Sequence, residues 1–326
     1  MNIFLLFDKK EKNSFLYTGL KAHYSNVFEI DNPKDSNIKT WMKGALQLLR
    51  MSDKNDILIC WFDFQAVLCY WFSLLLFQKR NIIALNIMLK DKPTIKNKCV
   101  SYLYKKALTN KRFKATFATK EYANLCCGKL KIDIDKPILR DVYIPSIQAK
   151  KQQDNKRSVF VGGRNARDWK TAFAVAEKMQ DVSFTFVLPP DEYDKYISKN
   201  YANVQFHKSV TLNEFISLQK ESSITYLPLN TEIPAGLIVL YQSAQIHQMV
   251  VTSDTCTTRG YITNGFSGAL VPLFSVDEAI KTIDYYLANI DKRNFCCDNL
   301  LSFLELECNQ NKYIETIIEL IELFPN

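Results

Sequence analysis

Short apolar runs alternate with helix-like segments along nearly the whole chain, and this alternation limits the fold more than any other feature. The first half contains strand-like runs such as Asn2–Phe7, Asp56–Cys60 and Asn81–Met88. Segments whose apolar residues recur at helical spacing separate these runs. Alternating strands and helices of this length are typical of a parallel sheet with helices on both faces. The sequence therefore predicts an α/β fold.

The alternation stops once and then restarts. Residues 146–157 (SIQAKKQQDNKR) are polar and lack an apolar period, so we interpret them as a linker that follows a last short strand at Asp141–Ile144. A chain of 326 residues is also long for a single core. We therefore expect two doubly wound, Rossmann-like domains in tandem, 1–150 and 151–312.

Charge is distributed unevenly between the two halves. Residues 1–157 carry 29 Lys and Arg against 14 Asp and Glu, whereas residues 158–326 carry 13 against 20. Positive charge is densest in Lys79–Arg140, with 16 basic and four acidic residues. This surface is either a solvated lysine-rich face or one that attracts anionic lipid headgroups. A nucleic-acid-binding protein is a third possibility, but no nucleic-acid-binding motif supports it.

Nine cysteines occur without a CxxC pair, so we expect reduced thiols in a cytoplasmic protein and no Cys/His metal site. The N-terminus lacks the basic region of a signal peptide. The most apolar run, Ala66–Phe77, is too short to span a bilayer, which needs roughly 20 residues.

The stretch Ser158–Lys170 says most about function. An apolar run leads into Gly162 and Gly163, and three cations follow: Arg164, Arg167 and Lys170. A strand, a glycine turn and a helix start can place N–H groups and cations against an anion. Neither the dinucleotide fingerprint nor the P-loop motif is present. The alternatives are an ordinary turn with solvated charges and a diphosphate site, and the cation spacing favours the second.

A second stretch, Pro234–Pro272, ends in NGFSGALVP at residues 264–272. This ending, the strand Val250–Ser253 and the GRNARDWKT segment from Gly163 to Thr171 resemble the C-terminal half of the group-1 (family 4) glycosyltransferases of the GT-B fold. The resemblance is good over about residues 158–290.

The resemblance implies two Rossmann-like domains facing a cleft. Residues 1–150, joined by a returning C-terminal helix at 313–326, would bind the acceptor, and residues 151–312 would bind the nucleotide-sugar donor. A retaining, metal-independent transfer to a glycan or lipid-linked acceptor in cell-surface polysaccharide synthesis is implied, with no cofactor beyond the nucleotide-diphosphate sugar. A cytoplasmic protein at the inner face of the membrane fits these expectations.

The resemblance also assigns residues. The implied donor-binding residues are Gly163, Arg164, Arg167, Lys170, Gly236, Leu237 and Gln242. The implied catalytic residues are Arg164 and Lys170, which would stabilise the leaving diphosphate, together with Asp8 in the N-terminal domain. Asp63 and Asp91 follow strand ends in the same way as Asp8 and are further candidates.

The chain departs from the family pattern at two positions. Pro234 and Gln242 stand where the family has two glutamates, and Glu232 lies two residues from the first of them. A glutamine can hydrogen-bond a ribose, but it carries no charge. The alternative is therefore a catalytically impaired, nucleotide-sugar-binding relative that acts as a partner or scaffold.

Overall fold

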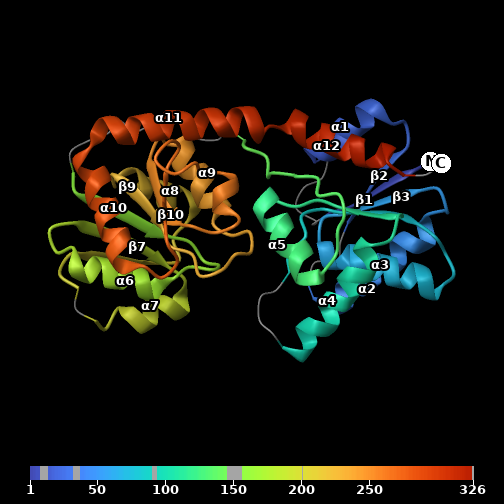
Figure 1. Ribbon diagram of the computed structural model, residues 1–326, viewed down its shortest axis with the longest axis horizontal. Helices are drawn as coiled ribbons and strands as arrows, with labels where there is room; N and C mark the ends of the chain where they lie inside the picture. Colours follow the sequence, from blue (N-terminus) through green and yellow to red (C-terminus); the bar gives the residue numbers. More distant parts are fainter. Residues whose placement is uncertain (8–13, 32–36, 90–93, 145–155, 200, 325–326) are drawn as a thin grey trace. The chain divides into compact units, whose positions relative to one another are not determined.

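The computed structural model describes residues 1–326 except 8–13, 32–36, 90–93, 145–155, 200 and 325–326. The chain divides into an N-terminal unit, Met1–Val142 with Cys308–Asn326, and a C-terminal unit, Tyr143–Glu307. Each unit contains a parallel sheet with helices on both faces, as the alternation of apolar runs predicts (Figure 1).

The N-terminal unit has a five-stranded parallel sheet in the order β2-β1-β3-β4-β5. Its strands are β1 (Ile3–Phe7), β2 (Val27–Asp31), β3 (Ile57–Cys60), β4 (Asn81–Ala84) and β5 (Phe113–Ala115). Its helices are α1 (Phe15–His23), α2 (Ile38–Met51), α3 (Asp63–Leu75), α4 (Ile95–Leu108), α5 (Lys120–Leu130) and α12 (Gln310–Glu322). In the register, Ile3 of β1 lies opposite Val27 and Ile57.

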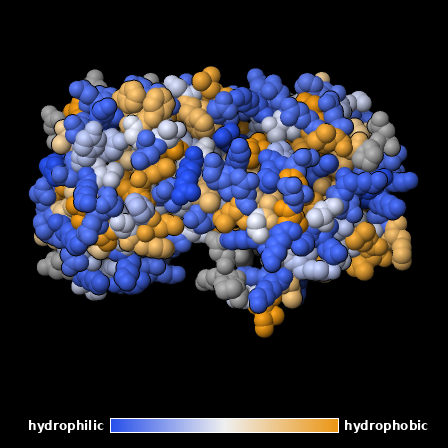
Figure 2. All heavy atoms as spheres, viewed as in Figure 1, coloured by the Kyte–Doolittle hydropathy of each residue, from blue (hydrophilic) through white to orange (hydrophobic). Residues whose placement is uncertain are grey.

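The last helix, α12, belongs to this unit because it packs on α1. Tyr313, Ile317 and Leu320 join a core with Leu16 and Leu20 of α1. Each fully buried aliphatic side chain of this kind contributes about 1.5–3 kcal/mol. On the other side of the sheet α2, α3 and α4 pack in sequence, and hydrophobic side chains reach the surface over α2 and α3 (Figure 2).

The C-terminal unit has a six-stranded parallel sheet in the order β11-β10-β9-β6-β7-β8. Its strands are β6 (Ser158–Gly162), β7 (Ser183–Leu188), β8 (Val204–Lys208), β9 (Ile224–Leu227), β10 (Met249–Ser253) and β11 (Ala269–Val271). Its helices are α6 (Trp169–Lys178), α7 (Pro190–Tyr196), α8 (Leu212–Lys220), α9 (Leu237–Gln245), α10 (Val276–Ala288), α11 (Ile290–Glu307) and the 3₁₀ turn η1 (Thr258–Gly260). Counted from β6, this is the strand order of the Rossmann fold.

Three elements differ from the sequence-based expectation. Asp141–Ile144 is not a strand, because it has no neighbouring strand to pair with and only Tyr143 is buried there. Helix α7 begins at Pro190, a favoured first helical residue, but the predicted strand–loop pattern omits it. Helix α11 is also missing from the prediction, because Arg293 and two cysteines lie among its buried residues and weaken its apolar period.

Candidate functional site

The strand order of the C-terminal unit indicates where this unit would bind a ligand. Chain connections leave β6 and β9 in opposite directions, and ligands of such sheets bind outside the carboxyl ends of these two strands. Two loops meet at this place: residues 163–168 after β6 and residues 228–236 after β9. The stretch singled out in the sequence therefore lies at this switch point.

Backbone hydrogen bonds tie the two loops together. The N–H of Asp168 donates to the carbonyl of Pro228 at 3.1 Å, and the N–H of Asn230 donates to the carbonyl of Ala166 at 3.1 Å. The Asn230 side-chain amide also donates to the carbonyl of Arg167, at 3.1 Å. The two loops therefore form one structure, although 60 residues of chain separate them.

Arg167 lies at the centre of this structure and is only 6% exposed. Its Nε donates to the carbonyl of Gly162 at 2.8 Å, and Nη1 donates to the carbonyl of Asn165 at 2.9 Å. Burial lowers the pKa of Arg167 to about 10, so the guanidinium is still charged at neutral pH. Two donor nitrogens hold the turn, and Nη2 has no hydrogen-bond partner among the described residues.

The two predicted glycines lie against this guanidinium. Gly163 has φ +123°, and a Cβ there would overlap the Arg167 side chain. Gly236 has φ +81°, and a Cβ there would lie 3.5 Å from Arg167 Nη1 and 3.1 Å from a methyl group of Leu227. Both positions need glycine, because other residues rarely adopt this backbone conformation.

Arg164 and Lys170 lie on the exposed side of the same turn. Neither side chain has a hydrogen-bond or ion-pair partner in the part of the chain that the structure describes. Between them Asp168 caps α6 by accepting a hydrogen bond from the Thr171 N–H at 3.1 Å, which confirms the predicted helix start. The turn therefore presents two unpaired cations beside the N-terminus of a helix.

Helix α9 places a second helix N-terminus at the end of the loop after β9. Gly236 is its N-cap and has no side chain that could cap it, so the first N–H groups, including that of Leu237, have no acceptor within the helix. Such N–H groups carry partial positive charge and favour anions. Gln242 follows in the second turn, where its Oε1 is buried and lacks a hydrogen-bond partner among the described residues.

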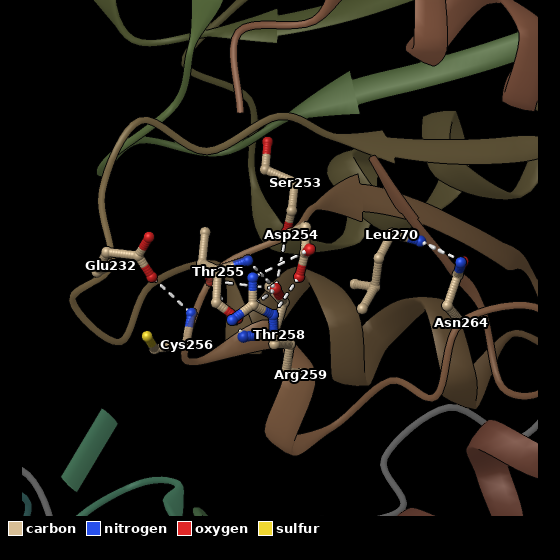
Figure 3. Close-up of polar contacts among 9 residues, drawn as sticks. All are labelled: Glu232, Ser253, Asp254, Thr255, Cys256, Thr258, Arg259, Asn264 and Leu270. Carbon is tan, nitrogen blue, oxygen red and sulfur yellow. Dashed lines mark hydrogen bonds and ion pairs between the residues drawn. The ribbon is translucent and has the colours of Figure 1, made fainter. Parts of the chain in front are cut away.

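Glu232, which the sequence places two residues from Pro234, contacts the loop after β10, and the sequence did not single out Asp254 and Arg259 in that loop (Figure 3). Glu232 Oε2 accepts a hydrogen bond from the Cys256 N–H at 2.6 Å. Asp254 and Arg259 form a two-pronged ion pair with distances of 2.6 and 3.1 Å. The signal that could have revealed this loop is an acid directly after a buried strand with an arginine five residues later.

The acidic candidates of the N-terminal unit have separate outcomes. Asp8 and Asp91 lie outside the described residues. Asp63 Oδ2 accepts hydrogen bonds from the Met88 N–H and the Tyr104 O–H, both at 2.7 Å. Burial raises the pKa of Asp63 despite these donors. Its carboxylate therefore joins the loop after β4 to helix α4, a structural use that weakens its candidacy as a catalytic base.

Comparison with known proteins finds matches to the structure of this chain but none to its sequence. No family model matches the sequence, and no curated protein matches it either. Solved structures match over the whole chain. Sucrose-phosphate synthase from Thermosynechococcus elongatus has a TM-score of 0.75 at 10% identity, covering 99% of this chain and 98% of the other. HepE from Anabaena in complex with UDP has a TM-score of 0.69 at 11% identity, covering 99% and 100%.

WaaG, a glycosyltransferase involved in lipopolysaccharide biosynthesis, matches with a TM-score of 0.66 at 11% identity and full coverage of both chains. The chain therefore has the GT-B fold with two Rossmann-like domains, and the predicted fold is confirmed. Identities of 10–11% establish this likeness for the fold alone.

Proposed function

We propose that this protein is a glycosyltransferase that moves a sugar from a nucleoside-diphosphate sugar to an acceptor hydroxyl. One observation carries the proposal: the exposed cations Arg164 and Lys170 and the uncapped N-terminus of α9 lie on the two loops at the switch point of the C-terminal sheet. A diphosphate is the ligand that this combination of charges and N–H groups fits best. The UDP complex of the structurally similar HepE supports this choice of ligand.

In the proposed reaction, the bond between the sugar C1 and the diphosphate oxygen breaks, and the nucleoside diphosphate leaves with the electron pair. The acceptor oxygen forms the new bond to C1 and gives its proton to a base. Arg164, Lys170 and the N–H of Leu237 would stabilise the charge that grows on the leaving oxygen. Gln242 would hydrogen-bond the ribose hydroxyls through its unpaired Oε1.

We extend the proposal to a hexosyl-type transfer that retains the anomeric configuration, with a glycan or lipid-linked acceptor in polysaccharide synthesis. The acceptor would bind the basic N-terminal unit, and the protein would work at the inner face of a membrane. The excess of positive charge in residues 1–157 supports this arrangement, because anionic lipids attract clustered Lys and Arg.

A thermal-shift screen against nucleoside diphosphates and their sugars tests the proposal. A ligand present at 100 times its dissociation constant stabilises the native state by about 2.7 kcal/mol. We expect one nucleotide to give such a shift, and we expect Arg164→Ala and Lys170→Ala to reduce it. Lys178→Ala is the matched control, because Lys178 lies at the other end of α6 and pairs on the surface with Asp277. No shift with any nucleotide, or equal losses in all three variants, would contradict the proposed site.

The second candidate is a nucleotide-sugar-binding relative without catalysis. Pro234 occupies a position where a carboxylate is expected, and the neighbouring Glu232 carboxylate hydrogen-bonds the backbone of the loop after β10. The two candidates are separated by measuring the release of nucleoside diphosphate from the nucleotide sugar that the screen identifies, with and without acceptors. Binding without release on any acceptor would favour the non-catalytic relative.

A further inference from the structure

Helix α3 ends in an exposed apolar segment, Leu74–Phe77, which we call the apolar tip. The exposed fractions of its four side chains are 43%, 70%, 50% and 96% in chain order. Figure 2 shows hydrophobic side chains gathered in the lower corner of the N-terminal unit, over α2 and α3. Single exposed apolar residues are common, but four in a row at the end of a helix indicate a binding surface.

The backbone of the apolar tip is strained at Phe77, and no packing of the Phe77 ring offsets this strain. The N–H of Gln78 donates to the Ser73 carbonyl at 2.7 Å, and the N–H of Phe77 donates to the Leu74 carbonyl at 3.1 Å. This is the Schellman pattern, whose left-handed residue is usually glycine. Here that residue is Phe77, with φ 55°, where a bulky side chain is unfavourable.

The end of α9 has the same pattern and gives a comparison within the chain. The N–H of Gln248 donates to the Ser243 carbonyl at 2.8 Å, and His247 has φ 59°. The His247 ring, however, contacts Asp298 with an Nε2–Oδ1 distance of 2.8 Å, so the fold uses that side chain. Phe77 is 96% exposed, so its ring has almost no packing that could offset the strain.

Basic residues lie at the same end of the N-terminal unit as the apolar tip. Arg80 Nε donates to Ser52 Oγ at 3.0 Å, and Arg112 Nη1 donates to Asn81 Oδ1 at 2.9 Å, which brings the chain segments 49–56, 74–82 and 109–112 to the same end of the unit. These segments contain six basic residues. Arg80 is buried, and the other five form the basic rim: Arg50, Lys54, Lys79, Lys111 and Arg112. The two acids of these segments are Asp53 and the buried Asp56.

We propose that the apolar tip and its basic rim dock on an anionic lipid bilayer. The apolar side chains would enter the boundary between headgroups and acyl chains, and the cations would pair with anionic headgroups. Four exposed apolar side chains beside an excess of positive charge fit an anionic bilayer. Among the described residues no helix is long and apolar enough to cross a bilayer, so the contact would be peripheral. This docking does not depend on the proposed sugar transfer.

Vesicle co-sedimentation of the full chain tests the docking, with phosphatidylcholine alone and with an equal amount of phosphatidylglycerol added. We expect binding to the anionic vesicles that weakens as salt is raised. Leu75→Ser and Phe77→Gly should each reduce the bound fraction severalfold. Phe77→Gly should also raise the Tm, because glycine relieves the left-handed backbone, so loss of binding cannot be attributed to unfolding.

Ile95→Ser is the matched control, because Ile95 is 83% exposed in the same unit but lies at the start of α4. The end of α4 is near the tip, since Asn110 Nδ2 donates to the Tyr70 hydroxyl at 3.2 Å, and a helix of this length places its two ends about 20 Å apart. Absence of wild-type binding, or an equal loss in Ile95→Ser, would overturn the proposal. So would a self-association that Phe77→Gly abolishes without any vesicle binding. The nucleotide thermal shift should be unchanged in Phe77→Gly, which keeps this test separate from that of the proposed function.

Discussion

In the C-terminal unit a buried guanidinium fixes the turn after β6, whereas in the N-terminal unit a half-buried carboxylate joins the loop after β4 to helix α4. Arg167 donates to the carbonyls of Gly162 and Asn165. Asp63 accepts from the Met88 N–H and the Tyr104 O–H. Both side chains replace lost water with hydrogen bonds, as a charge that loses contact with solvent must.

The difference lies in what remains for a ligand. Around Arg167 the loops present further positive charge, on Arg164 and Lys170, and open N–H groups at the start of α9. Around Asp63 the donors point at the carboxylate itself and are used up by it. The loops around Arg167 can therefore favour an anion, whereas the contacts of Asp63 chiefly fix the position of the loop after β4 and of helix α4.

Among these substitutions, Gly163→Ala should lower the free energy of unfolding most, because it disrupts the turn that Arg167 fixes. The new Cβ would overlap the Arg167 guanidinium, and the backbone at φ +123° would be strained, so we expect a loss of about 3 kcal/mol in the free energy of unfolding. Chemical denaturation followed by circular dichroism measures it. Gly128→Ala is the control: Gly128 lies inside α5 with open space around its Cβ, and the change should stabilise by about 0.5–1 kcal/mol. Similar effects of the two substitutions would contradict this account of the turn.

Asp63→Ala should lower the free energy of unfolding by a smaller amount. It leaves the Met88 N–H and the Tyr104 O–H without their acceptor, at a cost of about 2 kcal/mol. Asp53→Ala, at an exposed acid of the same unit, should change stability by less than about 0.5 kcal/mol. In a double-mutant cycle Asp63→Ala and Tyr104→Phe should be less than additive, and strict additivity would show that the two side chains do not interact.

The smallest expected effect is a pH dependence of the stability that Asp63 contributes. Burial raises the pKa of Asp63, so the folded state binds its proton more tightly than the unfolded state does. The stability of the wild type relative to Asp63→Asn should therefore be highest below the unfolded pKa of about 3.9. It should fall as the pH rises toward the raised folded pKa and stay level above it. Tm differences measured across this range check the sign, and an increase with pH would contradict it.

Much of the fold can be predicted from patterns within short segments of the sequence. Apolar runs and helical spacing predicted nearly every strand and helix, because each element must bury one face, and the restart after the linker predicted two domains. Arg164, Lys170 and the helix start at Asp168 could be found in the same way, since the glycine turn and the cations lie within one short segment.

The tertiary structure alone decided what depends on contacts between distant residues. The burial of Arg167 arises from a loop about 60 residues away, which no local pattern contains. The same holds for Asp63, whose partners lie 25 and 41 residues along the chain. The sequence by itself determined which segments form strands and helices and where positive charge gathers. Packing decided which charges are buried as supports and which remain exposed for a ligand, because burial depends on neighbours that only the folded chain brings together.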